Sequence, residues 1–190
     1  MNSPADSVVA YILAKDGNRP HLLEAAFAVD AQLRMEVLTN AISFPSEAKG
    51  RGALADILVR RFNQAYENIY TFCLGAPPQP GAQSFSCSWL VAMSDKESGA
   101  ARVGCGLYVW SFAPIDWTVT QLFIRIDAME VLPPASLGAI TEWASMLPYP
   151  WCPMHVATAA LPNIGQLDTV ARALDLASRP ITPKNVGHSA

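Results

Sequence analysis

Charged residues make up only 15% of this 190-residue sequence, and they do not gather into clusters. Lysine and arginine number 13, against 16 aspartate and glutamate residues, so the formal net charge is −3. No basic cluster is longer than the pair Arg60-Arg61. Proteins that bind nucleic acid neutralise phosphates with gathered basic residues. We therefore expect no nucleic-acid partner.

Long hydrophobic runs are absent as well. No apolar run approaches the roughly 18 residues that a membrane-spanning helix needs. The first residues, Met-Asn-Ser-Pro-Ala-Asp, lack the charged and apolar regions of a secretion signal. We expect a cytoplasmic protein with no membrane partner.

Cysteine and histidine are scarce, with four and three residues respectively. Without an export signal, the cysteines are expected to be buried free thiols and not a disulfide framework. Cys152 and His155 have a spacing that suits two metal ligands, but no second pair of ligands accompanies them in the sequence. We expect neither a metal ion nor another cofactor.

Apolar periodicity is what the sequence does contain, since 51% of its residues are hydrophobic, enough for one substantial core. Apolar residues at positions 8, 9, 12 and 13 recur at helical spacing between Pro4 and Gly17 and predict a first helix. A short second helix is predicted from Pro20 to Phe27. From Ala31 the pattern alternates and predicts a half-buried strand, with Leu33, Met35 and Val37 facing inward.

The middle of the chain predicts one helix followed by four strands. After a loop that contains Pro45 and Gly50, apolar residues repeat every four positions from Leu54 to Tyr66, as in an amphipathic helix. Strands are predicted at 68–74, 85–93, 103–112 and 119–132, and their succession indicates an antiparallel meander. Because the helices precede the strands instead of alternating with them, the predicted fold class is α+β.

The C-terminal part differs in character from the rest. Pro133-Pro134 ends the last predicted strand, and an apolar stripe from Leu137 to Leu147 predicts a helix that stops at Pro148. The remainder is rich in proline and holds one amphipathic stretch at 167–174. We predict a domain at 1–132 and a C-terminal helix with a proline-rich arm at 133–190. The arm would pack on its own domain or on a partner subunit.

The order of helix, short helix, strand, glycine-led helix and curved meander resembles the nuclear transport factor 2-like superfamily, also called the SnoaL-like or cone-shaped α+β fold. The matching residues are Tyr11, the turn Asp16-Gly17-Asn18, the segment Phe27-Ala28-Val29-Asp30-Ala31, and Gly50 through Phe62. Residues 68–153 also resemble uncharacterised bacterial members. The resemblance implies a conical pocket between the helices and the concave face of the sheet, commonly in a homodimer that pairs through the sheets.

The ketosteroid isomerases of that superfamily use an aspartate base, with a tyrosine and a protonated aspartate as hydrogen-bond donors. Tyr11 occupies the place of the donor tyrosine. The base would stand five residues after Asp30, where this chain has Met35, which cannot accept a proton. The strand at 103–112, which would supply the second acid, contains no carboxylate. The resemblance therefore disfavours that isomerase chemistry, and no motif of the cyclases or dehydratases matches.

Three residues are candidates for catalysis: Tyr11, Arg125 and Asp127. Epoxide hydrolases of this fold use an Asp-Arg-Asp arrangement, and Arg125 and Asp127 lie two positions apart on one strand face. The pair is either a surface ion pair or an acid–base pair in the pocket. Tyr11 is either a core aromatic residue or a catalytic hydroxyl donor.

Five residues are candidates for ligand binding: His21, Met35, Trp89, Tyr108 and Trp110. Tyr108 and Trp110 share a strand face with Gly104 and Gly106, which would leave room beside the rings. This aromatic face, and that of Trp89, would line either a pocket or a dimer interface. His21 is either a solvent-facing helix residue or a pocket residue.

We predict a protein that binds a small apolar molecule, either without catalysis or as a cofactor-independent isomerase, cyclase, dehydratase or hydrolase. The alternative is a non-catalytic accessory or interaction protein. In both cases a homodimer is expected. The sequence leaves open whether the protein is an enzyme.

Overall fold

A computed structural model of the chain describes residues 3–178. Helix α1 (Pro4–Asp16) begins with a capping box, in which the Ser3 side chain accepts a hydrogen bond from Asp6 N and the Asp6 side chain accepts one from Ser3 N. A 3₁₀ turn (Pro20–Leu22) and the short helix α2 (Leu23–Ala26) follow. The first predicted helix is thus confirmed.

One mixed sheet of seven strands forms the centre of the molecule, in the order β2-β1-β6-β5-β4-β3-β7. Neighbours from β3 to β6 are antiparallel, whereas β1 runs parallel to β6 and β7 runs parallel to β3. The strands are β1 (Phe27–Val37), β2 (Glu47–Lys49), β3 (Tyr66–Leu74), β4 (Ser84–Asp95), β5 (Ala101–Phe112), β6 (Val119–Leu132) and β7 (Trp151–Cys152). The predicted α+β class and the antiparallel meander are confirmed.

Two details of the predicted strands were wrong. The strand expected from Ala31 begins at Phe27, because α2 ends at Ala26 and the fully buried Phe27 ring joins the core. The loop at 38–50 contains the edge strand β2, which at three residues is too short to show an alternating pattern.

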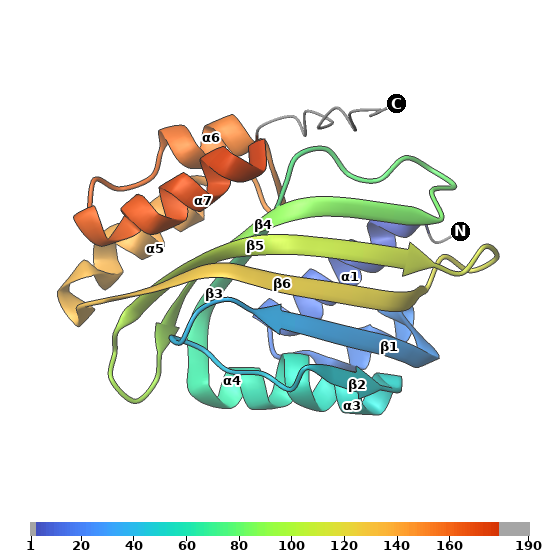
Figure 1. The fold of residues 1–190 in the computed structure, drawn as a ribbon. Coiled ribbons are helices and arrows are strands. Elements are labelled where there is room, and N and C mark those ends of the chain that lie inside the picture. The colour runs from blue at the N-terminus through green and yellow to red at the C-terminus, as the bar shows by residue number, and fades with distance from the viewer. Residues whose placement is uncertain (1–2, 179–190) are drawn as a thin grey trace, which may run out of the picture.

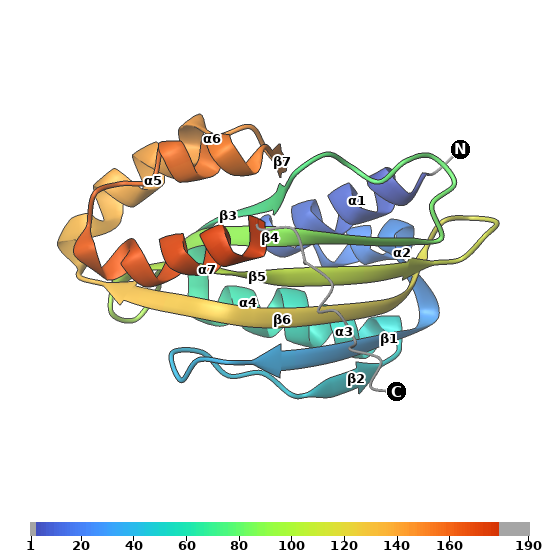
Figure 2. The same cartoon turned by 45° about the horizontal axis from the view of Figure 1, so that its top comes forward.

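Helices cover both faces of the sheet (Figures 1 and 2). The inner face is covered by α1, α2 and a continuous helical segment that comprises α3 (Arg51–Ala55), a π-helical stretch (Asp56–Arg61) and α4 (Phe62–Ala65). The outer face is covered by α5 (Leu137–Met146), α6 (Met154–Ala159) and α7 (Asp168–Ser178). The sheet therefore separates an inner from an outer apolar cluster.

The C-terminal segment packs on its own domain. Val170 and Leu174 of α7 are buried in the outer cluster with Ile140 of α5 and with Val103 and Leu132 of the sheet. Of the two placements left open for the predicted arm, the described part of the arm shows the packing on its own domain. Helix α6 and strand β7 were not predicted, and the part of the arm at 179–190 lies outside the described residues.

A β-bulge in β6 changes which side chains face inward. Ile126 pairs with Gly106 and Ala128 pairs with Cys105, so Asp127 is the extra residue between two paired positions. Strict alternation predicts Ile126 and Ala128 on one face, but Ala128 belongs to the outer cluster and Met129 to the inner cluster. The bulge thus turns Met129 toward the inner side of the sheet.

None of the helices within residues 3–178 is long and apolar enough to cross a membrane.

Candidate ligand-binding cavity

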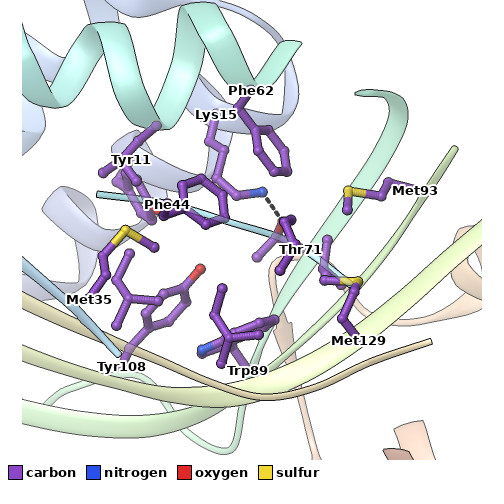
Figure 3. A pocket seen from close by; sticks show the side chains of 15 residues that line it. Tyr11, Lys15, Met35, Phe44, Phe62, Thr71, Trp89, Met93, Tyr108 and Met129 are labelled. Carbon is purple, nitrogen blue, oxygen red and sulfur yellow. Dashed lines mark hydrogen bonds between the residues drawn. The ribbon is translucent and has the colours of Figure 1, made fainter. Parts of the chain in front are cut away.

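A cavity of about 40 Å³ lies between α1, the helical segment at 51–65 and the inner face of the sheet (Figure 3). Its lining is mostly apolar or aromatic and consists of Tyr11, Lys15, Met35, Ile42, Phe44, Leu58, Phe62, Thr71, Trp89, Val91, Met93, Tyr108, Ile124, Ile126 and Met129. The space suits only a few water molecules. Methionine side chains are flexible, so rearrangement of the three in the lining would admit a larger guest.

A buried ion pair stands at the polar end of this cavity. Lys15 Nζ lies 2.9 Å from Asp16 Oδ1 and donates a hydrogen bond of 2.6 Å to Thr71 Oγ1, which in turn donates one of 2.7 Å to Asp16 Oδ1. The side chains of Lys15 and Asp16 are only 9% and 6% exposed. Lys15 Nζ also lies 4.5 Å from the centroid of the Phe62 ring. Figure 3 shows Lys15 reaching from the helix toward Thr71.

The local fold explains why Lys15 is buried. Val8, Tyr11, Ile12 and Lys15 fall on one face of α1, at the i, i+3, i+4 and i+7 spacing, and all are buried. Asn63 Nδ2 donates to the Lys15 carbonyl oxygen at 2.7 Å, so this group of the last helical turn is satisfied. Lys15 was not among the predicted site residues, although its place on this apolar stripe is a signal in the sequence.

Tyr11 and Tyr108 bring two hydroxyl groups to the cavity. Both residues are buried, and their ring centroids are 6.1 Å apart in an edge-on arrangement. Burial raises the pKa of each hydroxyl, although the Tyr108 hydroxyl offsets part of the rise for Tyr11. Both groups therefore remain protonated donors at neutral pH. The Tyr11 hydroxyl lies near that of Tyr108, but within hydrogen-bonding geometry it has no partner among the residues that the structure describes.

Two glycines of β5 make room for the floor of the cavity. A Cβ atom on Gly106 would lie 1.8 Å from the Arg125 carbonyl oxygen and 2.8 Å from the Trp89 ring. Trp89 passes over this position, and its Nε1 donates to the Arg125 carbonyl oxygen at 3.2 Å. A Cβ atom on Gly104 would lie 2.4 Å from Met129 Cε. The sequence predicted room beside the rings of Tyr108 and Trp110, whereas in the structure Trp89 and Met129 occupy the space at these glycines.

The structure brings together four of the predicted site residues: Tyr11, Met35, Trp89 and Tyr108 all line the cavity. Trp110 is fully buried but lies against Tyr11, at 5.4 Å between ring centroids, and does not line the cavity. His21 is exposed on the 3₁₀ turn and does not line it either. The functional roles of these residues stay predictions.

Arg125 and Asp127 lie away from the cavity. Ile124 and Ile126 point inward, so Arg125 between them points to the outer face of β6. Its Nε and Nη2 atoms donate to the two Asp127 carboxylate oxygens at 2.6 and 3.2 Å, and this contact raises the pKa of Arg125. The structure therefore places the pair together but apart from Tyr11. A catalytic role for the pair stays a prediction.

Asp16 and Thr71 were not predicted as site residues, and neither was Tyr149, whose hydroxyl donates to Asp16 Oδ2 at 3.0 Å. The backbone N–H of Thr71 donates to the same oxygen at 2.6 Å. These contacts join α1, β3 and the segment after α5, which lie far apart in the sequence. A local sequence pattern therefore does not predict them.

No protein-family model and no curated protein matches the chain. Solved structures do. A nuclear transport factor 2-like protein from Burkholderia thailandensis superposes with a TM-score of 0.53 at 11% identity, over 67% of this chain and 92% of that one. A hypothetical protein with a ketosteroid isomerase-like fold from Catenulispora acidiphila, in complex with trimethylamine, superposes with a TM-score of 0.51 at 16% identity, over 75% of this chain and 98% of that one. A putative isomerase from Rhodopseudomonas palustris superposes with a TM-score of 0.52 at 12% identity, over 63% of this chain and 84% of that one. At such identities the similarity concerns the fold alone.

Proposed function

We propose that this chain, which has the nuclear transport factor 2-like fold, binds a small apolar molecule that carries one polar oxygen. The unpartnered hydroxyl of Tyr11 at the wall of an apolar cavity is the observation that carries the proposal. A buried donor left without a partner costs about 1–3 kcal/mol. An oxygen of a bound molecule would accept this hydrogen bond and remove the penalty.

The polar end of the cavity favours a neutral oxygen over a charged one. A lysine ammonium has three donors, of which Lys15 uses two, on Asp16 and Thr71. Because Asp16 already balances the charge of Lys15, a bound carboxylate would be a buried charge without a partner, which is costly. A ketone, an aldehyde or an ester would accept from Tyr11, Tyr108 or Lys15 without that penalty.

Access to the cavity runs past two stacked aromatic rings. Ile42, Phe44 and Phe62 line the cavity and also a neighbouring outer pocket of about 270 Å³. The Phe44 and Phe62 rings stack with centroids 6.2 Å apart and planes inclined by 23°. Displacement of Phe44, which lies in the loop between β1 and β2, would connect the two spaces.

Binding is better supported than proton-transfer catalysis. Among the described residues that line the cavity there is no aspartate, glutamate or histidine, and Asp16 reaches it only through Lys15 and Thr71. In this structure Lys15 acts as a hydrogen-bond donor, to Asp16 and to Thr71. The trimethylamine complex of the similar Catenulispora acidiphila protein supports occupation of this fold by a small molecule.

The experiment compares two probes of equal shape, cyclohexanone and methylenecyclohexane, which differ in the oxygen. Binding is followed by NMR of ¹³C-methyl-labelled methionine, because Met35, Met93 and Met129 line the cavity. We expect both probes to shift these three methyl signals, with cyclohexanone bound about tenfold more tightly, the effect of roughly one hydrogen bond.

Variants assign the effect to the Tyr11 hydroxyl. Tyr11→Phe should bring the two affinities together, whereas Tyr70→Phe, which removes a hydroxyl outside the cavity, should leave their ratio unchanged. Methionine signals that respond to neither probe, or equal affinities in the unsubstituted protein, would refute the proposal.

A further inference from the structure

A second concave site lies outside the cone and is lined by residues from the C-terminal end of α1, from strand β3 and from helix α5. This cleft has a volume of about 720 Å³. Ligand pockets commonly measure roughly 300 to 1,000 Å³. None of the described residues lines both the cleft and the inner cavity. The two are therefore separate spaces.

The walls of the cleft offer aromatic and apolar surface. Tyr70 and Tyr149 stand nearly at right angles, with ring centroids 6.4 Å apart and planes inclined by 88°. Leu13, Ile69 and Leu137 add aliphatic surface. Tyr149 is 40% exposed, a large open fraction for an aromatic side chain. Such a surface suits a flat ring that packs on one tyrosine and against the edge of the other.

The charge of the cleft is set by two residues, Asp16 and Arg19, the only charged ones in its lining within residues 3–178. The Asp16 carboxylate is occupied, since it accepts hydrogen bonds from Lys15, from Thr71 and from Tyr149. The guanidinium group of Arg19 forms neither an ion pair nor a hydrogen bond with any described residue. The cleft thus presents one unpaired positive charge.

We propose that this cleft binds a small molecule with a flat apolar ring and a carboxylate group. The ring packs on Tyr70 and Tyr149, and the carboxylate pairs with Arg19. A planar guanidinium matches a carboxylate through two parallel hydrogen bonds. The site differs from the inner cavity in selecting an anion, because its cation has no partner whereas Lys15 already has one.

Gly138 supplies a way to block the cleft without disturbing the fold. It lies in the first turn of α5 and lines the cleft, and a Cβ atom there would meet no other atom within 4 Å. A leucine at this position would occupy the cleft, and leucine favours a helix more than glycine does. Gly52 in α3 is the matched control, since it is also helical with no atom within 4 Å of its added Cβ, and it does not line the cleft.

The test uses 2-naphthoate and its neutral counterpart 2-naphthamide as probes, titrated by calorimetry at low ionic strength because an exposed charge pair is screened by salt. We expect 2-naphthoate to bind about tenfold more tightly than 2-naphthamide, the effect of roughly one charge-assisted pair. Arg19→Gln should abolish this preference. Arg172→Gln, which removes an exposed charge from α7, should retain it. Gly138→Leu should lower the affinity for both probes at least tenfold, whereas Gly52→Leu should leave both affinities unchanged.

Four results would overturn the proposal: no binding of 2-naphthoate, equal affinities in the unsubstituted protein, an unchanged preference in Arg19→Gln, or undiminished binding to Gly138→Leu. Arg19→Gln alters an exposed side chain and decides the outcome even if Gly138→Leu fails to fold. If 2-naphthoate still binds to Gly138→Leu and shifts the methionine methyl signals of the inner cavity, the anion binds in that cavity and not in the cleft.

Discussion

The hydroxyl of Tyr149 donates a hydrogen bond of 3.0 Å to Asp16 Oδ2, across 133 positions of the sequence. The other oxygen of the same carboxylate accepts from Lys15 Nζ at 2.9 Å. Asp16 therefore lies in the wall between the outer cleft and the inner cavity. Through it, the segment that follows α5 supports the position of the cavity lysine.

Tyr149→Phe should weaken the binding of cyclohexanone in the inner cavity. Loss of one hydrogen bond to a carboxylate costs about 1.5 kcal/mol at most here, because the tyrosine is partly exposed. Lys15 would then be held less firmly against Thr71. We expect a two- to fivefold loss of cyclohexanone affinity, about 0.4 to 1 kcal/mol, with methylenecyclohexane unaffected. An equal loss for both probes would indicate a general distortion and contradict this role of Tyr149.

Asp16→Asn should destabilise the protein far more than the loss of an exposed ion pair does. Removing one partner of a buried pair leaves the other charge uncompensated, at a cost of about 3–5 kcal/mol. Asp56→Asn is the matched control, because its pair with Arg60 has both side chains 53% exposed. That change should cost less than about 1 kcal/mol.

Urea unfolding of both aspartate variants at pH 7 measures the difference. Adding Lys15→Met to Asp16→Asn removes the stranded charge and should recover part of the stability. Equal unfolding free energies for the two single variants would show that Lys15 finds other partners.

Alkaline pH should unfold the protein through its buried acids. Burial, with a smaller effect of the Asp127 charge, raises the pKa of the Cys105 thiol from 9.0 to about 12. The pKa values of Cys73 and Tyr108 are raised as well, for Cys73 by its contact with Cys87 and by burial, and for Tyr108 chiefly by burial. The folded state binds more protons than the unfolded state above pH 9, so stability is fully present below that pH and falls as the pH rises.

For Cys105 alone, the loss reaches about 1.4 kcal/mol per pH unit between pH 9 and 12. Unfolding free energies measured by urea titration from pH 7 to 10.5 should decline with a steepening slope. Cys105→Ala should make that slope shallower, and a slope identical to that of the unsubstituted protein would contradict the assignment.

The resemblance predicts a homodimer that pairs through the sheets, and only part of the outer face of this sheet is free for such pairing. Helices α5 and α7 cover the outer cluster, and the exposed Val109 on β5 lies outside it. We predict a dimer through this uncovered region in size-exclusion chromatography with light scattering. Val109→Glu should give a monomer, whereas Val29→Glu, a change of an exposed valine at the start of β1, should not. A monomeric unsubstituted protein would refute the homodimer.

Apart from the short strand β2, the order of elements in the first 132 residues could be predicted because helix and strand periodicities are clear there. For β4 and β5 the alternation predicted which side chains share a face, but not whether the face of Trp89 and Tyr108 is the inner one, where the structure places both. In β6 the prediction of side-chain faces is wrong after Ile126, because a β-bulge at Asp127 inserts one residue into the strand. The amino-acid composition of β6 does not indicate this bulge.

The ion pair at the cavity was missed for a different reason. Lys15 lies on the apolar stripe of α1, but a charged residue at the end of a helix is usually solvated. Lys15 donates to Thr71 of β3 and to Asp16, and Asp16 in turn accepts from Tyr149 in the segment after α5. Contacts between residues so far apart in the sequence follow from tertiary packing. The pattern of residues in one short stretch of sequence does not predict them.

The division of the apolar residues into two clusters by the sheet has a consequence for how the molecule opens. The buried apolar residues of α5, α6 and α7 belong to the outer cluster, whereas the apolar lining of the cavity belongs to the inner one. Native proteins open in cooperative units that are smaller than the whole. We expect the outer helical layer to open as one such unit while the central strands stay hydrogen-bonded, so that amide protons of α7 exchange with solvent before those of β4 and β5.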